Sequence, residues 1–175
     1  DLAAGGYKIE MYFNGASGIG TTINLTGILN SGDVYVVCQS GATSDFTGMA
    51  DQQNGSSWYN GDDAVVLRNA GGILDVIGQI GVDPGITGWV VGAGSTTDNS
   101  LVRKSNVVKG NLDWATAAAE WDVIGANNFT GLNTHTYDGC GCNAPTGISF
   151  SAITNASFKV SWLPVAGATK YQVWF

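Results

Sequence analysis

The side chains that could carry out chemistry are few in this chain of 175 residues, and His135 is its only histidine. A catalytic triad places a histidine beside a nucleophile and a carboxylate, yet no Gly-x-Ser-x-Gly motif marks a nucleophilic serine. The glycine-containing stretch at residues 17–20 lacks the Lys-Ser/Thr ending of a phosphate-binding loop, so it is predicted to be a hairpin connection. The sequence therefore predicts no catalytic residue.

Two adjacent carboxylates, Asp62 and Asp63, follow Asn60 in a segment with the composition of a turn. Carboxylate oxygens suit calcium, and Asp75 or Asp83 could join them only if the fold brought them close. The sequence has no Asp-x-Asp-x-Asp-Gly spacing. Aspartate and asparagine in turns also accept hydrogen bonds from nearby backbone. A turn is the favoured interpretation, and a calcium site at Asp62 and Asp63 is the weaker alternative.

Three cysteines stand at positions 38, 140 and 142. The spacing of Cys140 and Cys142 is too tight for half of a structural zinc site, and no second pair exists. Cys38 shares a face of a predicted strand with Val34 and Val36, which suits a buried free thiol. The alternative is a disulfide from Cys38 to Cys140 or Cys142, which in the entropic model would stabilise the fold by ~4–5 kcal/mol.

Six tryptophans could serve either packing or the stacking of sugars. Trp121 and Trp162 lie in strand-like runs and are expected in the core. Trp58, Tyr59 and Trp89 lie at the edges of predicted loops and are the candidates for a binding surface. Packing remains the favoured role for these aromatic side chains.

The charge balance argues against nucleic acid as a direct partner of this chain. Its formal net charge is −7, whereas binding to a duplex needs several basic side chains on one face. Only Arg103, Lys104 and Lys109 lie close together in the sequence. No apolar run approaches the ~20 residues of a membrane-spanning helix, so no membrane span is predicted.

Residues 7–13 alternate strictly between two kinds of side chain. This period of two predicts a half-buried strand. One set would face the core and the other the solvent: Tyr7, Ile9, Met11 and Phe13 inward, and Lys8, Glu10 and Tyr12 outward.

The clearest local signal is a predicted β-hairpin. Two runs rich in Val and Ile, residues 64–67 and 73–77, flank Asn69-Ala70-Gly71-Gly72, whose glycines can adopt the positive φ of a tight reversal. Asp75 interrupts the second run, so that strand is expected to be only partly buried.

Further short strands are predicted at 21–25, 34–38, 101–104 and 121–124, with a bridge near 89–91. Residues 111–119 form the best helical segment, with Asp113 as its cap. With 26 glycines and 12% charged residues, this pattern predicts an all-β fold, an antiparallel sandwich.

The order of several motifs resembles the lamin-tail-type domain, an immunoglobulin-like β-sandwich found in exported bacterial proteins. The matching segments are residues 60–63, 64–68, 75–78, 101–104, 120–122 and 131–136. The resemblance implies a domain over residues 1–139 that lacks its first strands. Its open sheet edge is expected to be covered by the rest of the parent chain or by another polypeptide.

Residues 140–175 resemble the opening of a fibronectin type III domain. Pro145 precedes the first expected strand, Trp162 lies on the second and Tyr171 on the third. Such a sandwich needs ~100 residues, so a second, incomplete domain is expected here.

These resemblances imply a secreted or cell-surface module that is not an enzyme, with His135 as a structural or surface residue. Its expected role is adhesion, spacing or the presentation of an attached enzyme within a larger protein. Surface polysaccharide or a secretion apparatus are further expected partners. The alternatives are a carbohydrate-binding module and an accessory segment of a secreted nuclease or other hydrolase.

Overall fold

The computed structural model describes residues 1–137 and 145–165. Short β-strands dominate its regular structure, and the predicted all-β class is confirmed. Cys140, Cys142 and Tyr171 lie outside the described residues.

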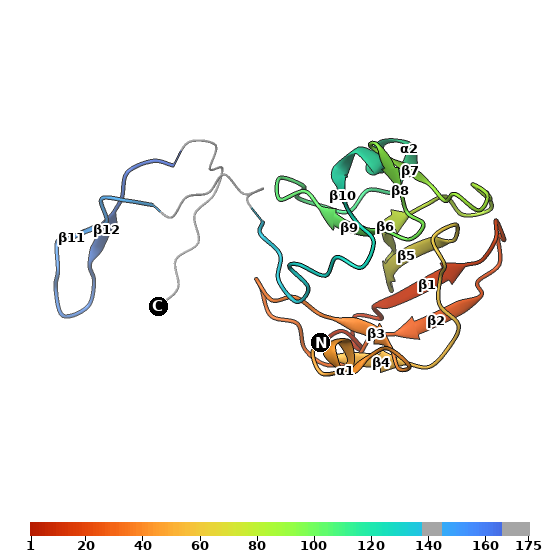
Figure 1. The fold of residues 1–175 in the computed structure, drawn as a ribbon. Coiled ribbons are helices and arrows are strands. Elements are labelled where there is room, and N and C mark those ends of the chain that lie inside the picture. The colour runs from red at the N-terminus through yellow and green to blue at the C-terminus, as the bar shows by residue number, and fades with distance from the viewer. Residues whose placement is uncertain (138–144, 166–175) are drawn as a thin grey trace.

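A four-stranded antiparallel sheet forms the centre of the fold, in the order β2-β1-β5-β6 (Figure 1). Its strands are β1 (Lys8–Tyr12), β2 (Thr21–Asn24), β5 (Ala64–Asn69) and β6 (Gly72–Ile77). Residues 13–20 connect β1 to its antiparallel partner β2, as predicted for a hairpin. The β5–β6 hairpin is confirmed, with Asn69 opposite Gly72.

The other strands form two-stranded pairs. They are β3 (Val37–Gln39) with β4 (Gln52–Asn54), β7 (Val90–Val91) with β8 (Gly94–Ser95), β9 (Ser100–Arg103) with β10 (Trp121–Gly125), and β11 (Ser149–Ser151) with β12 (Lys159–Ser161). The helices are α1 (Ser44–Thr47), α2 (Trp114–Ala117) and the 3-10 turn η1 (Ala118–Glu120). The predicted helix is therefore present, and the Asp113 side chain caps it by accepting from the Ala115 N–H at 3.1 Å.

The strand predicted at residues 34–38 begins later and pairs in parallel, which differs from the antiparallel expectation. Its neighbour β4 is not among the predicted strands. The intervening α1 carries the chain across, so β4 approaches β3 in the same direction. The Asp51 carboxylate accepts from the Val36 N–H at 2.7 Å and anchors the start of this pair.

The central sheet is buried on both faces. Tyr12, Val66 and Val76 point to one face, where Trp89 and Trp114 cover them. Leu2, Met11, Ile23 and Leu25 form a second cluster on the opposite face. Successive residues of a strand point to opposite sides, so β1 contributes to both clusters through Met11 and Tyr12.

The prediction that β1 is half-buried is therefore wrong. Glu10 is 1% exposed and Tyr12 is 7% exposed, although both were expected to face solvent. The Tyr12 ring packs into the first cluster. The Glu10 carboxylate lies between Lys8 and Arg68, each at 3.4 Å. Burial of this charge is tolerated because two cations and one hydroxyl surround it.

The strand that opens the chain is not an edge strand, because β1 lies between β2 and β5. Side chains and loops of the chain also contact the two outer strands. Gln52 donates to the Asn24 carbonyl at 2.8 Å beside β2. Beside β6, the Val76 N–H donates to the Asn111 carbonyl at 3.2 Å. These bonds occupy one backbone group on each of the two outer strands.

The β11–β12 hairpin is drawn apart from the central sheet in Figure 1. Its strands pair antiparallel, with Phe150 opposite Val160. Ile148, Phe150 and Ile153 are each at least half exposed.

Replacement of the buried Met11 by alanine tests the second apolar cluster. Met11 is 1% exposed, and the cavity left by Met11→Ala should lower the free energy of unfolding by roughly 2–5 kcal/mol. Urea denaturation followed by tryptophan fluorescence measures the change. The control Ile86→Ala, at a side chain 89% exposed, should shift the midpoint little. Equal effects of both substitutions would contradict the assigned core.

Candidate functional site

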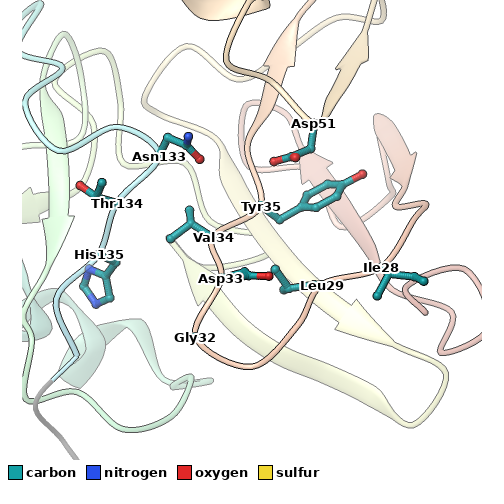
Figure 2. Close-up of a pocket in the computed structure, with 10 residues that line it drawn as sticks. All are labelled: Ile28, Leu29, Gly32, Asp33, Val34, Tyr35, Asp51, Asn133, Thr134 and His135. Carbon is teal, nitrogen blue, oxygen red and sulfur yellow. The ribbon is translucent and has the colours of Figure 1, made fainter.

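His135 lines a pocket of about 510 Å³ beside the segment that leads into β3. Figure 2 shows Asn133, Thr134 and His135 on one side of this pocket, with Asp33 and Val34 facing them. The structure thus brings the only histidine into a concave site with two carboxylates, Asp33 and Asp51, that the sequence analysis did not select.

The polar groups of this pocket already have partners in turns and loops. Asp33 accepts from the Asn30 amide at 2.9 Å, and Asp51 accepts from the Val36 N–H. Thr134 donates its hydroxyl to the Gly131 carbonyl at 2.9 Å. No hydrogen bond joins His135 to either carboxylate among the residues that the structure describes, and His135 and Asp51 lie at opposite ends of the pocket in Figure 2. The geometry is not that of a triad.

The two carboxylates of the turn differ, since Asp62 Oδ1 is buried without a hydrogen-bond partner in the described residues whereas Asp63 bonds to backbone. Asp63 is 5% exposed, and its two oxygens accept from the N–H groups of Asn14 at 2.8 Å and Asn60 at 3.0 Å. This is the backbone-bonding role of the turn interpretation. Asp75 is ion-paired elsewhere, and Asp83 accepts from the Gly85 N–H.

Metal ligands are not gathered elsewhere in the described segments. Within residues 1–137 and 145–165, no three His, Cys, Asp or Glu side chains come together as a metal-holding group.

Cys38 is buried, and no disulfide joins it to another of the described residues. It lies on β3 and shares its alternation with the buried Val36. The predicted disulfide partners, Cys140 and Cys142, lie outside the described residues, so the pairing stays a prediction.

Of the three aromatic residues predicted at a binding surface, Trp89 lies in the core instead, so that prediction is wrong. Its side chain is 9% exposed and packs against Trp114, with ring centroids 6.4 Å apart. Gly78, at a φ of +79°, allows this burial, since a Cβ there would lie 2.5 Å from the indole Nε1. Tyr59 is 49% exposed, and its ring lies 6.1 Å from that of the partly buried Trp58 at 36°.

A buried polar cluster surrounds Glu10. Tyr12 donates its hydroxyl to Glu10 at 3.0 Å, and Lys8 and Arg68 flank the carboxylate. Burial raises the pKa of Tyr12 above its usual value of 10.0, the bond to Glu10 and its negative charge raise it further, and Arg68 opposes them. The cluster holds the neutral phenol against the carboxylate.

A second polar cluster centres on Arg103 at the end of β9. Its guanidinium forms ion pairs with Asp75 of β6 and Glu120 of η1, and lies 4.9 Å from the centroid of the Trp121 ring. A planar guanidinium can engage two carboxylates and an aromatic face at once. The sequence analysis missed this cluster because its members are separated by up to 45 residues, and only the proximity of Arg103 to Lys104 was visible.

A groove of about 930 Å³ lies between the start of β3, β9 and the central sheet. We call it the β3–β9 groove. Its lining includes residues 34–37 on one side, residues 99–105 on the other, and Val65 and Ile77 of the central sheet. A neighbouring apolar pocket of about 580 Å³ shares Tyr35, Val37, Val65, Ile77 and Trp121 with it.

The chain has no recognisable relative in any of the three comparisons: no family model, no curated protein and no solved structure matches it. In the described part of the chain, no helix has the length and apolar character needed to cross a membrane.

The raised pKa of Tyr12 predicts a pH-dependent loss of stability. The folded protein keeps this proton longer than the unfolded chain, so the contribution is complete below about pH 10 and is lost as the pH rises through the raised pKa. Tyr12→Phe should cost about 1–2 kcal/mol at neutral pH, yet lose less stability than the original as the pH rises above about 10. Urea denaturation at several pH values measures how the free energy of unfolding depends on pH in both proteins. The same dependence in both would show that the pKa of Tyr12 is not raised by folding.

The Arg103 cluster predicts an asymmetric response to substitution. Arg103→Met should destabilise the fold by about 2 kcal/mol, less than a fully buried pair, because Asp75 and Glu120 are about one quarter exposed. Arg103→Lys should recover only part of this loss, since lysine cannot bridge both carboxylates in one plane. Chemical denaturation gives the free energies, with Lys109→Met as the matched loss of a cation. If Arg103→Lys were as stable as the original protein, the guanidinium would not be bridging Asp75 and Glu120.

Proposed function

We propose that this chain is a non-catalytic β-sandwich module of a larger exported protein, secreted or held at the cell surface. Its role there is adhesion, spacing or the presentation of an attached enzyme. The motif order that resembles the lamin-tail-type domain, residues 1–139, and the fibronectin type III opening, residues 140–175, supports this proposal.

The main structural support for this proposal is that several charged side chains have structural roles. Asp63 holds a turn, Asp113 caps a helix, and Arg103 joins three elements through its two ion pairs. These groups stabilise a small β fold, which is what a spacing or presenting module requires. The exposed apolar side chains of the β11–β12 hairpin are in keeping with the start of a second module.

A carbohydrate-binding module is the second candidate function. It is favoured by Tyr59, which is half exposed beside Trp58. Flat aromatic surfaces of this kind stack on sugar rings. The inclination of 36° between the two rings leaves one platform rather than a continuous flat surface.

An accessory segment of a secreted hydrolase is the third candidate, and the pocket around His135 is the observation in its favour. Histidine is the usual general base near neutral pH. In that case Asp33 or Asp51 would have to leave its present partner to orient the imidazole.

An export fusion tests the proposed role directly. The chain is placed between a bacterial export leader and a reporter enzyme, with a flexible linker of equal length as the control. The chain should resist protease outside the cell and keep the reporter active. Degradation outside the cell, combined with stability inside it, would contradict an extracellular module.

Substrate assays separate the alternatives. The chain should hydrolyse a model phosphodiester and a model ester no faster than buffer does, and His135→Ala should change nothing. A rate lost in His135→Ala would establish the hydrolase reading. Retention on a polysaccharide column that Tyr59→Ala abolishes, but Phe150→Ala leaves intact, would establish carbohydrate binding instead.

A further inference from the structure

The β3–β9 groove is bounded by two strand edges and the face of a sheet. A strand seen from its face contributes alternate residues, whereas a strand seen from its edge contributes consecutive ones. Residues 34–37 and residues 99–105 line the groove without a gap, while β5 contributes Val65 alone. The groove therefore has an apolar floor from the central sheet. One wall is formed by residues 34–36 with Val37, the first residue of β3, and the other by the edge of β9.

The backbone groups at both walls lack a strand partner in the described residues. Val36 and Ser40 bond to the β4 side, so the N–H and C=O groups of Val37 point the other way. On β9, Lys104 bonds to Glu120 beside β10, which by the same period directs Leu101 and Arg103 outward. Both strands have one strand neighbour only. Unpaired edges of this kind accept a further strand.

The space suits one strand. A strand occupies about 3.3 Å along its length, about 4.8 Å between neighbours and about 10 Å between layers, or roughly 160 Å³ per residue. The groove of about 930 Å³ has the volume of roughly six such residues, and part of that volume lies along residues 128–136. The side chains over its floor would meet Val65 and Ile77, which are only partly buried.

Two polar features indicate the chemistry of the occupant. The Trp121 side chain lines the groove, and its Nε1, which is buried, has no hydrogen-bond partner among the described residues. Asp33 and Asp51 flank the β3 end, both are exposed, and neither is in an ion pair of the described segments. Those charges favour a cation near that end.

We propose that the β3–β9 groove binds an extended segment of another polypeptide as a β-strand between β3 and β9. The segment carries apolar side chains at alternate positions and a lysine or arginine at the end beside Asp33 and Asp51. The backbone edges supply affinity, and the floor and the two carboxylates supply specificity. This inference rests on the groove alone and requires neither export nor adhesion.

The segment at residues 128–136 also lines the groove and would have to make room for such a strand. It is held by few bonds: Asn128 donates to the Ile124 carbonyl at 2.9 Å, and the Phe129 ring packs edge-on against Phe46 with centroids 4.5 Å apart. Residues 129–136 are exposed. A segment of this kind can be displaced without loss of the core.

Synthetic peptides test the proposal. The probe is a fluorescein-labelled octapeptide of alternating valine and threonine with two lysines at one end, made in both orientations. Fluorescence anisotropy with the 175-residue chain should show saturable binding of one orientation. A control peptide of the same composition, with its valines in one block, should bind at least 10-fold more weakly, as should a peptide with glutamates replacing lysines.

Variants of the chain place the binding. Val37→Pro removes the N–H from the β3 edge without touching a bond to β4 and should weaken binding at least 10-fold, while Ile86→Ala should leave it unchanged. Asp33→Lys, at an exposed position that needs no core change, should reverse the preference between the lysine and glutamate peptides. Hydrogen exchange should slow at Val37 and Leu101 when the peptide binds.

Several outcomes would overturn the proposal. Equal binding of the alternating and block peptides, or a preference unchanged by Asp33→Lys, would exclude strand insertion at this site. A concentration-dependent dimer that Val37→Pro dissociates would identify a second copy as the occupant. Slow exchange at Val37 without any peptide would show that the chain covers its own edge.

Discussion

The fold depends on one constraint: the central sheet carries apolar side chains on both of its faces, so both faces must be covered. Met11 and Tyr12 are neighbours on β1 and belong to different clusters. One face is covered by Trp89 and Trp114, which approach from β7 and α2. The other is covered by the N-terminal turn at Leu2 and by the segment that leads into β3. The small elements exist to meet this demand, since none of them has enough core to stand alone.

The same constraint explains where charge is buried. A strand that is covered on both sides has no solvent face, so Glu10 can be accommodated only with Lys8, Arg68 and Tyr12 around it. At the sheet edge, Arg103 is likewise partly buried and paired with opposite charges. It connects β9 to Asp75 of β6 and to Glu120, and so fixes the β9–β10 pair against the central sheet. Both clusters are weak as isolated ion pairs and useful because they determine which elements meet.

Local signals in the sequence were enough for the β5–β6 hairpin and for the cap of α2. The reversal at Asn69 and the hydrogen bond of Asp113 involve neighbouring residues, so composition and spacing predict them. The second buried face of β1 was not predictable, because strict alternation is also the pattern of a half-buried strand and the cations that satisfy Glu10 include Arg68, 58 positions away. The pocket around His135 was not predictable for a similar reason, because Asp33 and Asp51 are far from His135 in the sequence and only the fold brings them together. Trp89 was misplaced because its burial depends on the close approach to Gly78.

The two faces of the central sheet differ in how completely they are covered. Val66 is 0% exposed and Ala64 is 3% exposed on the first face, whereas Val65 and Leu67, on the same strand, remain partly exposed on the second. The cover on that second side comes from the N-terminal turn at Leu2 and from the segment that leads into β3. The β3–β4 and β9–β10 pairs, which border the β3–β9 groove, do not bond to each other. Two-stranded pairs are marginal in water, so each relies on its anchor, Asp51 for one and Arg103 for the other. A strand between them would convert two marginal pairs into one layer and would bury the remaining apolar floor. Binding in this groove and the stability of the fold should therefore be thermodynamically linked, since a ligand that prefers the folded state stabilises it.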